Sequence, residues 1–317
     1  MRQQVASENN PWAAIDSKAT IGELRARRID SSHPHSFFWA LNSEGRKLLV
    51  LESKNGFSTT CELPSLRGIA ITLSEGRLVL RLQDVTSVEI FVALCRNIVA
   101  RTQIAMTDEE LLNATLEQLF KWQAFLSKPN SGLLNDSELR GLIGELYFIY
   151  SQLIPRFGDK SINFWLGPSG APQDFSIGRE VFEVKTKLAG SSDVIRISSI
   201  EQLWVTDANL YLVHYTIGET IESDALSVSA PSLIENIRGM LQNQETVDRF
   251  DDQLLLFGYV DHPVYRRRLF RLSSPRYYKV RDGFPRLSMN LPLGITAVNY
   301  GIELSACLPF ESEPEWN

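Results

Sequence analysis

The chain has 317 residues, of which 44% are hydrophobic and 22% are charged, and this composition is typical of a globular protein with a full core. It excludes a largely disordered, collagen-like or coiled-coil chain. Lys and Arg number 32 and Asp and Glu number 38, so the formal net charge is −6. That charge excludes a histone-like coat for nucleic acid, although it leaves room for a local basic patch.

The cysteines and the apolar runs indicate the compartment. Cys61, Cys95 and Cys307 are odd in number and widely scattered, so they predict neither a disulfide framework nor a zinc ribbon. The first residues lack the apolar core of a signal peptide, and no run of about 18 apolar residues predicts a membrane-spanning helix. We therefore expect a cytoplasmic protein with no membrane partner.

The first third of the chain reads as β-rich. Short apolar or alternating runs, separated by turn residues, predict an antiparallel meander from the segments SFFWAL, RKLLVLES, STTCEL, GIAITLSE and GRLVLRLQ. A buried helix is expected from about Val88. Together these elements predict an N-terminal β-rich domain over residues 1–105.

The remainder, residues 106–317, alternates between helical and strand patterns. Thr107, with Glu110 three residues later, predicts the start of one helix, and a second is expected from Asn135 or Asp136 to Pro155. A further helix is expected near residues 232–241, and strands are predicted at INFWL, QDFSI, EVFEVKTKL, VIRIS, NLYLVHYTI and QLLLFGYV. The predicted class is α/β, or α+β, with a mixed sheet flanked by helices.

Ionisable residues interrupt two adjacent strands in this second domain. Alternation along FEVKT places Glu183 and Lys185 on one face, and a tight turn at residues 177–179 lets Asp174 reach Glu183. Two neighbouring carboxylates repel unless a cation lies between them. Oxygen ligands without His or Cys favour a hard ion such as Mg²⁺.

A third carboxylate lies on the preceding helix. Glu145 borders the apolar stripe that contains Leu142 and Ile149, and the neighbouring Gly144 permits close approach to a sheet. A glutamate at the edge of a buried face needs a partner or an ion.

Simpler interpretations of these residues stay open. Glu183 and Lys185 also fit a surface ion pair on a solvated strand, and Glu145 fits the exposed side of an amphipathic helix. Lys187 continues the face of Lys185 and suits either phosphate contact or solvent. Gln202 suits a hydrogen bond at a helix start better than a catalytic role.

The same residues resemble the PD-(D/E)XK nuclease superfamily, in the order helix Glu, then Asp, then Glu-x-Lys. They resemble in particular PD-(D/E)XK proteins from bacterial defence and restriction-like gene clusters, through GLIGEL, a Trp-x-Gly-Pro turn, an Asp-Phe strand and FEVKT, followed by Ile-Ser-Ser and Gln-Leu. The likeness is strong over residues 136–205 and looser towards the C-terminus. The proline stands two residues before the aspartate, as Pro172-Gln173-Asp174, rather than beside it.

The resemblance implies a restriction-endonuclease-like core and hydrolysis of phosphodiester bonds with Mg²⁺, for which Mn²⁺ is an expected substitute. It implies that Asp174 and Glu183 are metal ligands, that Lys185 positions or activates the attacking water, and that Glu145 is an accessory ligand.

A basic segment at residues 266–286 is the candidate surface for nucleic acid. It carries a net charge of +7, which leaves −13 for the rest of the chain. Its basic side chains include Arg266, Arg267, Arg268 and Arg271. Aromatic residues alternate with them, a mixture that suits phosphate contact with base stacking. A solvated strand edge, or an interface to an acidic partner, explains the segment equally well.

The sequence thus predicts a metal-dependent nuclease acting on DNA in an anti-phage or restriction-like system. Its expected partners are DNA, other subunits of a defence complex and a second copy of the chain. The alternatives are a DNA-binding or scaffold subunit that does not cleave, and a purely structural interaction protein.

Overall fold

The computed structural model of the chain describes residues 10–15, 20–21, 24–53, 55–57, 62–74, 76–83, 88–128, 132–221 and 224–316. It divides into two compact units, Met1–Leu133 and Leu134–Asn317.

Over its described residues, the first unit is a six-stranded antiparallel sheet with two α-helices and a short 3₁₀ helix, Pro11–Ala14. The strands pair in the order β1-β2-β3-β4-β6-β5. Their bounds are β1 Thr20–Ile21, β2 Leu24–Arg28, β3 Ser36–Leu41, β4 Lys47–Glu52, β5 Ile69–Ser74 and β6 Arg77–Leu82. The predicted antiparallel strands are therefore confirmed at four of the five runs, although β6 rather than β5 lies beside β4. The fifth run, STTCEL, falls mainly outside the described residues, and Cys61 lies there with it.

Two long helices, α2 Val88–Arg101 and α3 Asp108–Leu126, belong to this unit. The Thr107 side chain accepts from the Glu110 amide at 3.1 Å, as its sequence pattern predicts. Indole Nε1 of Trp122 on α3 donates to Asn97 on α2 at 3.0 Å. Because α3 packs on α2, the boundary between the units falls after Leu133, later than the residue 105 suggested by the sequence.

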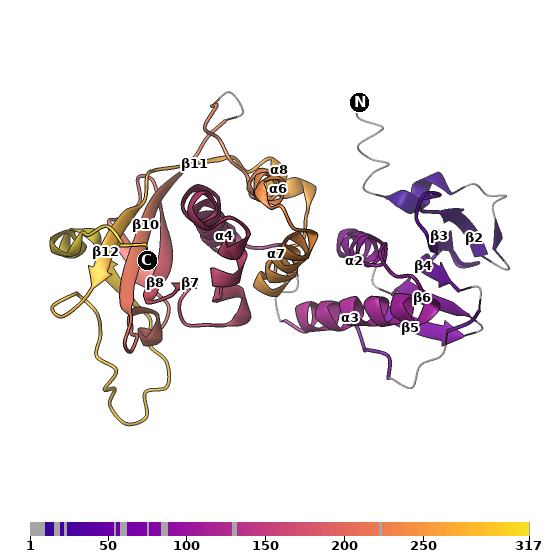
Figure 1. Cartoon of the computed structure of the whole chain (residues 1–317), viewed down its shortest axis with the longest axis horizontal. Coiled ribbons are helices and arrows are strands. Elements are labelled where there is room, and N and C mark those ends of the chain that lie inside the picture. Colours follow the sequence, from indigo (N-terminus) through magenta and orange to yellow (C-terminus); the bar gives the residue numbers. More distant parts are fainter. Residues whose placement is uncertain are drawn as a thin grey trace. The chain divides into compact units, whose positions relative to one another are not determined.

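The second unit is built on a mixed sheet in which β10 is central (Figure 1). β8 pairs with β10 in parallel, while β7, β11 and β12 join antiparallel, and β9 pairs separately with β13. The bounds are β7 Phe175–Ile177, β8 Glu180–Leu188, β9 Val194–Ile197, β10 Asn209–Glu219, β11 Phe270–Leu272, β12 Arg276–Val280 and β13 Tyr300–Glu303.

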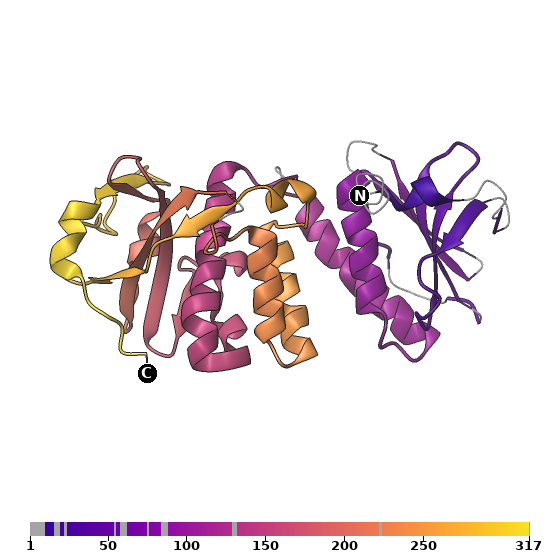
Figure 2. The ribbon, with the colours of Figure 1, turned by 90° about the horizontal axis from the view of Figure 1, so that it is seen from above.

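Helices cover one face of this sheet. α4 packs on β8 and against α6, and Figure 2 shows α6 and α7 beside it in orange. The α-helices of the unit, of which α9 lies on the opposite face, are α4 Asp136–Phe148, α5 Ile154–Phe157, α6 Ala230–Met240, α7 Gln244–Phe257, α8 Pro263–Arg266 and α9 Leu304–Cys307. Five shorter helical turns span Ile149–Leu153, Gly158–Phe164, Gly167–Ser169, Ile200–Leu203 and Leu308–Phe310.

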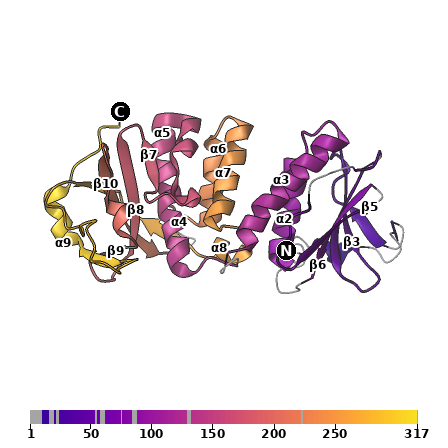
Figure 3. The same cartoon turned by 90° about the horizontal axis from the view of Figure 1, so that it is seen from below.

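The two faces of the sheet bury different sets of side chains. Phe182 and Val184 point into the large core under α4 and α6. Val181 and Leu212 point into a second core on the side of β9 and α9, and Figure 3 shows these elements across the sheet from α4. Alternation along β8 therefore buries both faces, and Glu183, Lys185 and Lys187 share the face of Val181.

The predicted fold class is confirmed, because a mixed sheet flanked by helices is consistent with a restriction-endonuclease-like fold. Two predicted strands are wrong. QLLLFGYV lies mostly in α7, where Phe250 and Leu254, four residues apart, are both buried, so the helical period decides its structure. INFWL forms a 3₁₀ turn that ends at Phe164.

The buried thiols Cys95 and Cys307 form no disulfide. Among the residues described, no helix combines the length and the apolar character needed to cross a bilayer.

Candidate active site

The hairpin β7–β8 sets the positions of the predicted site residues. Phe175 pairs with Phe182, and this antiparallel register, continued by one residue, brings Asp174 opposite Glu183. The turn contains Gly178, whose φ of +58° lies in the left-handed region that favours glycine. A tight local turn thus places two carboxyl groups side by side.

Asp174 is held by the neighbouring strand. Its Oδ2 accepts a hydrogen bond from the Val184 amide at 2.7 Å. Burial raises the pKa of Asp174 to about 6, although the charge of Lys185 and the Val184 amide both act to lower it. The acid therefore sits where its ionised form is poorly solvated.

Glu183 is completely buried, and its carboxylate lies beside one cation. Lys185 Nζ is 2.6 Å from Glu183 Oε1. Apart from this ion pair, no side-chain hydrogen bond to the Glu183 carboxylate is found among the residues described. Burial and then the charge of Asp174 raise the pKa of Glu183 to about 8, against the opposing effect of Lys185.

Lys185 lies on the same face of β8, as alternation predicts. Burial lowers the pKa of Lys185, but the charges of Glu183 and Asp174 outweigh burial, so its pKa lies above the ordinary value. The lysine is therefore a cation at neutral pH, with its ammonium inside the acidic cluster.

Glu145 reaches the same cluster from α4. Trp165 Nε1 donates to Glu145 Oε2 at 2.7 Å, and both side chains are buried. A Cβ on Gly167 would lie 3.0 Å from Asp174 Oδ1 and 3.4 Å from Glu145 Oε2, so both carboxylates border this glycine. Burial, followed by the charge of Asp174, raises the pKa of Glu145 well above its ordinary value.

Close packing of helix on strand makes this reach possible. A Cβ on Gly144 would lie only 2.4 Å from Cγ2 of Thr186 on β8. Glycine is thus the residue that lets α4 approach the strand carrying Glu183 and Lys185.

One polar contact of the lysine was not anticipated. Gln202 Oε1 accepts from Lys185 Nζ at 3.2 Å and from the Ser198 amide at 2.8 Å. The sequence favoured a hydrogen bond at a helix start, and the contact with Lys185 emerges only in the folded chain. In the sequence, the only indication of a role for Gln202 is that the Gln-Leu pair belongs to the motifs that resemble the PD-(D/E)XK family.

Lys187 lies two residues further along the same face. Its Nζ is 2.5 Å from Asp193 Oδ1, and its side chain is 12% exposed, whereas that of Asp193 is 80% exposed. The structure thus pairs Lys187 with a solvated carboxylate at the edge of the site.

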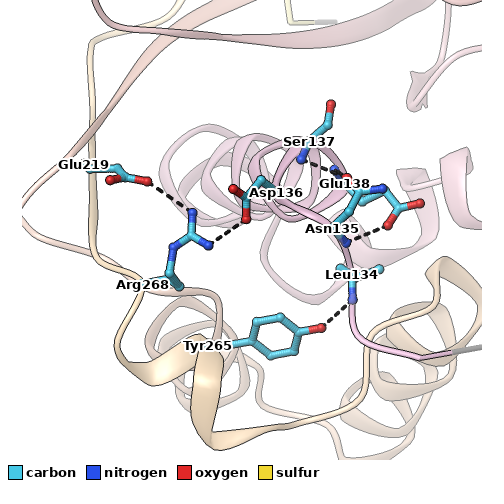
Figure 4. A network of polar contacts seen from close by, with 8 residues as sticks. All are labelled: Leu134, Asn135, Asp136, Ser137, Glu138, Glu219, Tyr265 and Arg268. Atoms are coloured by element: carbon cyan, nitrogen blue, oxygen red, sulfur yellow. Dashed lines mark hydrogen bonds and ion pairs between the residues drawn. The ribbon is translucent and has the colours of Figure 1, made fainter.

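Four arginines of the basic segment, Arg266, Arg268, Arg271 and Arg276, form ion pairs with acidic side chains of the same unit. Arg268 contacts Asp136 at 2.6 Å and Glu219 at 3.1 Å, at the start of α4 (Figure 4). Arg266 pairs with Asp261 and Glu235, and Arg271 pairs with Asp224. Arg267 is exposed and forms no ion pair with a described residue.

The aromatic residues of that segment do not face solvent. Tyr265 is 2% exposed, and its hydroxyl accepts from the Leu134 amide at 2.7 Å (Figure 4). Phe270, Tyr277, Tyr278 and Phe284 are also buried. The expectation that these rings stack on bases is wrong, because the two cores on either side of the sheet bury them.

The acidic cluster is not a ready-made metal site of three ligands. Within the described part of the chain, no three His, Cys, Asp or Glu side chains form such a group. Mg²⁺ is commonly held by one or two carboxylates together with waters and substrate phosphates. The carboxylate of Glu183, which lies next to that of Asp174 and has Lys185 as its cation, meets this smaller requirement.

The fold and the Asp–Glu–Lys hairpin define a PD-(D/E)XK-like protein. The family described as "Putative PD-(D/E)XK family member, (DUF4420)" matches residues 8–305, and the chain belongs to this family. Comparison with curated proteins and with solved structures gave no match. The family membership suggests a nuclease, and PD-(D/E)XK nucleases generally use divalent metals.

Proposed function

We propose that this chain is a divalent-metal-dependent nuclease that hydrolyses phosphodiester bonds of DNA in a bacterial anti-phage defence or restriction-like system. Family membership supports the nuclease class. We further propose Mg²⁺ as the cofactor, with Mn²⁺ able to replace it, and a cytoplasmic location.

The observation that carries this proposal is the unbalanced charge of the buried cluster. Three carboxyl groups, from Glu145, Asp174 and Glu183, surround one ammonium group, from Lys185. In their ionised forms they leave a formal charge of −2, which equals the charge that one divalent cation supplies in the opposite sign. Burying such a charge without a counter-ion is costly, which is why all three carboxyl pKa values are raised.

The residues divide the work as follows. Asp174 and Glu183 would hold the metal, with Glu145 as an accessory ligand. When bound, a divalent ion polarises the phosphate and lowers the pKa of a water molecule. Lys185, held by Glu183 and Gln202, would orient the attacking water and stabilise negative charge on the phosphate. Lys187 and Arg267 are proposed phosphate contacts, and we keep Arg266, Arg268 and Arg271 as weaker candidates because of their ion pairs.

The test joins metal binding to cleavage. Calorimetric titration with Mg²⁺ and Mn²⁺ should give a binding heat with the wild-type protein that is lost in Asp174→Asn and Glu183→Gln. Glu245→Gln, at an exposed position in the first turn of α7, is the matched control, because it makes the same chemical change away from the cluster. Cleavage, assayed on modified and unmodified DNA, should likewise be retained in the wild type and in Glu245→Gln and lost in Asp174→Asn and Glu183→Gln.

The alternative is a subunit that binds DNA, or scaffolds a complex, without cleaving. The 2.6 Å pair of Lys185 and Glu183 is also what a purely structural ion pair would look like. That alternative predicts no metal heat and no cleavage by any variant, alone or with partner subunits.

A further inference from the structure

The lysine of the site is held from outside the sheet. Gln202, which contacts Lys185, lies in the 3₁₀ turn Ile200–Leu203. The same Oε1 also accepts from the Ser198 amide, so the position of this oxygen depends on the path of the main chain over residues 198–204.

One side chain fastens that main chain to the hairpin. Gln173 Nε2 donates to the carbonyl oxygens of Glu201 at 2.5 Å and Trp204 at 3.0 Å, and it lies 3.4 Å from that of Gln202. An amide group offers two N–H donors, and the end of a helical turn offers carbonyls that lack helical partners. Gln173 thus closes the turn that carries Gln202.

Gln173 also precedes Asp174 in the chain. Asp174 is tied to β8 through the Val184 amide, while Gln173 is tied to the turn that contacts Lys185. Two consecutive residues therefore place the acid and the lysine of the site relative to each other.

We propose that Gln173 is a positioning residue, which orients Lys185 through Gln202. The inference rests on the proposed nuclease function and extends it to a residue that contacts neither metal nor lysine. Its effect is on the geometry of the reacting groups, so it falls on the chemical step rather than on binding of nucleic acid.

The turn has a second anchor, which keeps the test practicable. Arg286 Nη1 donates to the Leu203 carbonyl at 2.6 Å, and its guanidinium lies 3.8 Å from the centre of the Trp204 ring. Loss of the Gln173 amide should therefore loosen the turn without unfolding the unit.

The experiment compares Gln173→Met, Gln202→Met and the double variant in single-substrate cleavage kinetics. Methionine keeps the length of glutamine and removes its donors and acceptor. Each single variant should lower kcat by roughly 10- to 100-fold, the scale expected for a misplacement of about 1 Å, with KM and DNA affinity unchanged. The kcat of the double variant should be no lower than that of the worse single variant, because both substitutions disrupt the same chain of contacts from Gln173 through Gln202 to Lys185.

Gln244→Met, on the exposed start of α7, is the matched control and should cleave like the wild type. If Gln173→Met does not fold, Gln173→Glu, which has the same length and lacks the amide donors, replaces it. Two results with an active wild type would overturn this inference but leave the proposed function standing. One is an unchanged kcat in the Gln173 variant, and the other is a kcat loss in the double variant that equals the product of the two single losses. A wild type that never cleaves removes the proposed function and this inference together.

Discussion

The Val184 amide donates to Oδ2 of Asp174 at 2.7 Å, from the position on β8 that separates Glu183 and Lys185. The aspartate therefore hydrogen-bonds to the same strand that carries the other two residues. Strand geometry sets the spacing of Glu183 and Lys185, and this bond adds Asp174 to the set. Asp174, Glu183 and Lys185 thus form one local unit within the hairpin, and α4 adds Glu145 to it.

The raised carboxyl pKa values predict that the metal-free protein loses stability as pH rises. The pKa of Asp174 is raised to about 6 and that of Glu183 to about 8. At a pH between the ordinary pKa of each group and its raised pKa, the folded state therefore holds more protons than the unfolded state. Unfolding then releases protons, and the free energy of unfolding falls with pH by at most about 1.4 kcal/mol per unit for each group.

Calorimetric melting in a chelator from pH 6 to pH 9 should show this fall mainly through Glu183, because the Asp174 contribution lies largely below pH 6 and most other carboxyl groups are ionised throughout. Glu183→Gln should flatten the dependence. Mg²⁺ should raise Tm more at pH 8.5 than at pH 6, because a cation binds the ionised carboxylates. A Tm that climbs with pH in the chelator would contradict the assigned pKa shifts.

Replacing the lysine separates catalysis from binding. Lys185→Met should lower kcat by about 10²- to 10³-fold, the range for loss of one donor that stabilises negative charge in the transition state, while DNA affinity stays nearly constant. Lys187→Met is the comparison, because Lys187 pairs with exposed Asp193 at the edge of the site and should affect affinity instead. Equal losses of kcat in both variants would argue against a special role for Lys185.

Two glycines on one helix give a matched pair for packing. Gly144→Ala should destabilise the second unit by about 1–3 kcal/mol, because the new Cβ would lie 2.4 Å from Cγ2 of Thr186. Gly141→Ala, with no atom within 4 Å of its Cβ, should stabilise α4 by up to about 1 kcal/mol. Scanning calorimetry measures both, and Thr186→Ser should recover part of the loss in the Gly144 variant. Similar behaviour of the two alanine variants would show that α4 lies further from β8.

The ion pairs of the basic segment predict unequal roles for its arginines. Arg267→Glu should reduce the log–log salt slope of duplex DNA binding by about 0.9, the value for one lost phosphate contact. Arg268→Ala should change the slope little, because Asp136 and Glu219 already neutralise this side chain. Fluorescence anisotropy across a salt series measures both. If neither variant alters the slope, a protein interface becomes the better explanation of the segment.

Short-range patterns in the sequence were enough to predict the hairpin and its three ionisable residues. Alternation with a period of two placed Glu183 and Lys185 on one face, and the turn at Gly178 brought Asp174 back to them. The cap at Thr107 was likewise readable, because its hydrogen bond spans only three residues. Such features depend on neighbouring residues, whose geometry the backbone alone determines.

Contacts between distant segments were decided only by the tertiary structure. Trp165 supplies the hydrogen bond of Glu145, and Gln202 that of Lys185. The arginines after residue 265 looked like a free basic surface, yet Arg268 finds Asp136 132 residues away. The sequence shows where a charged residue stands but not which opposite charge the fold brings beside it. The burial of each carboxylate, which raises its pKa, likewise depends on how the helix packs on the sheet.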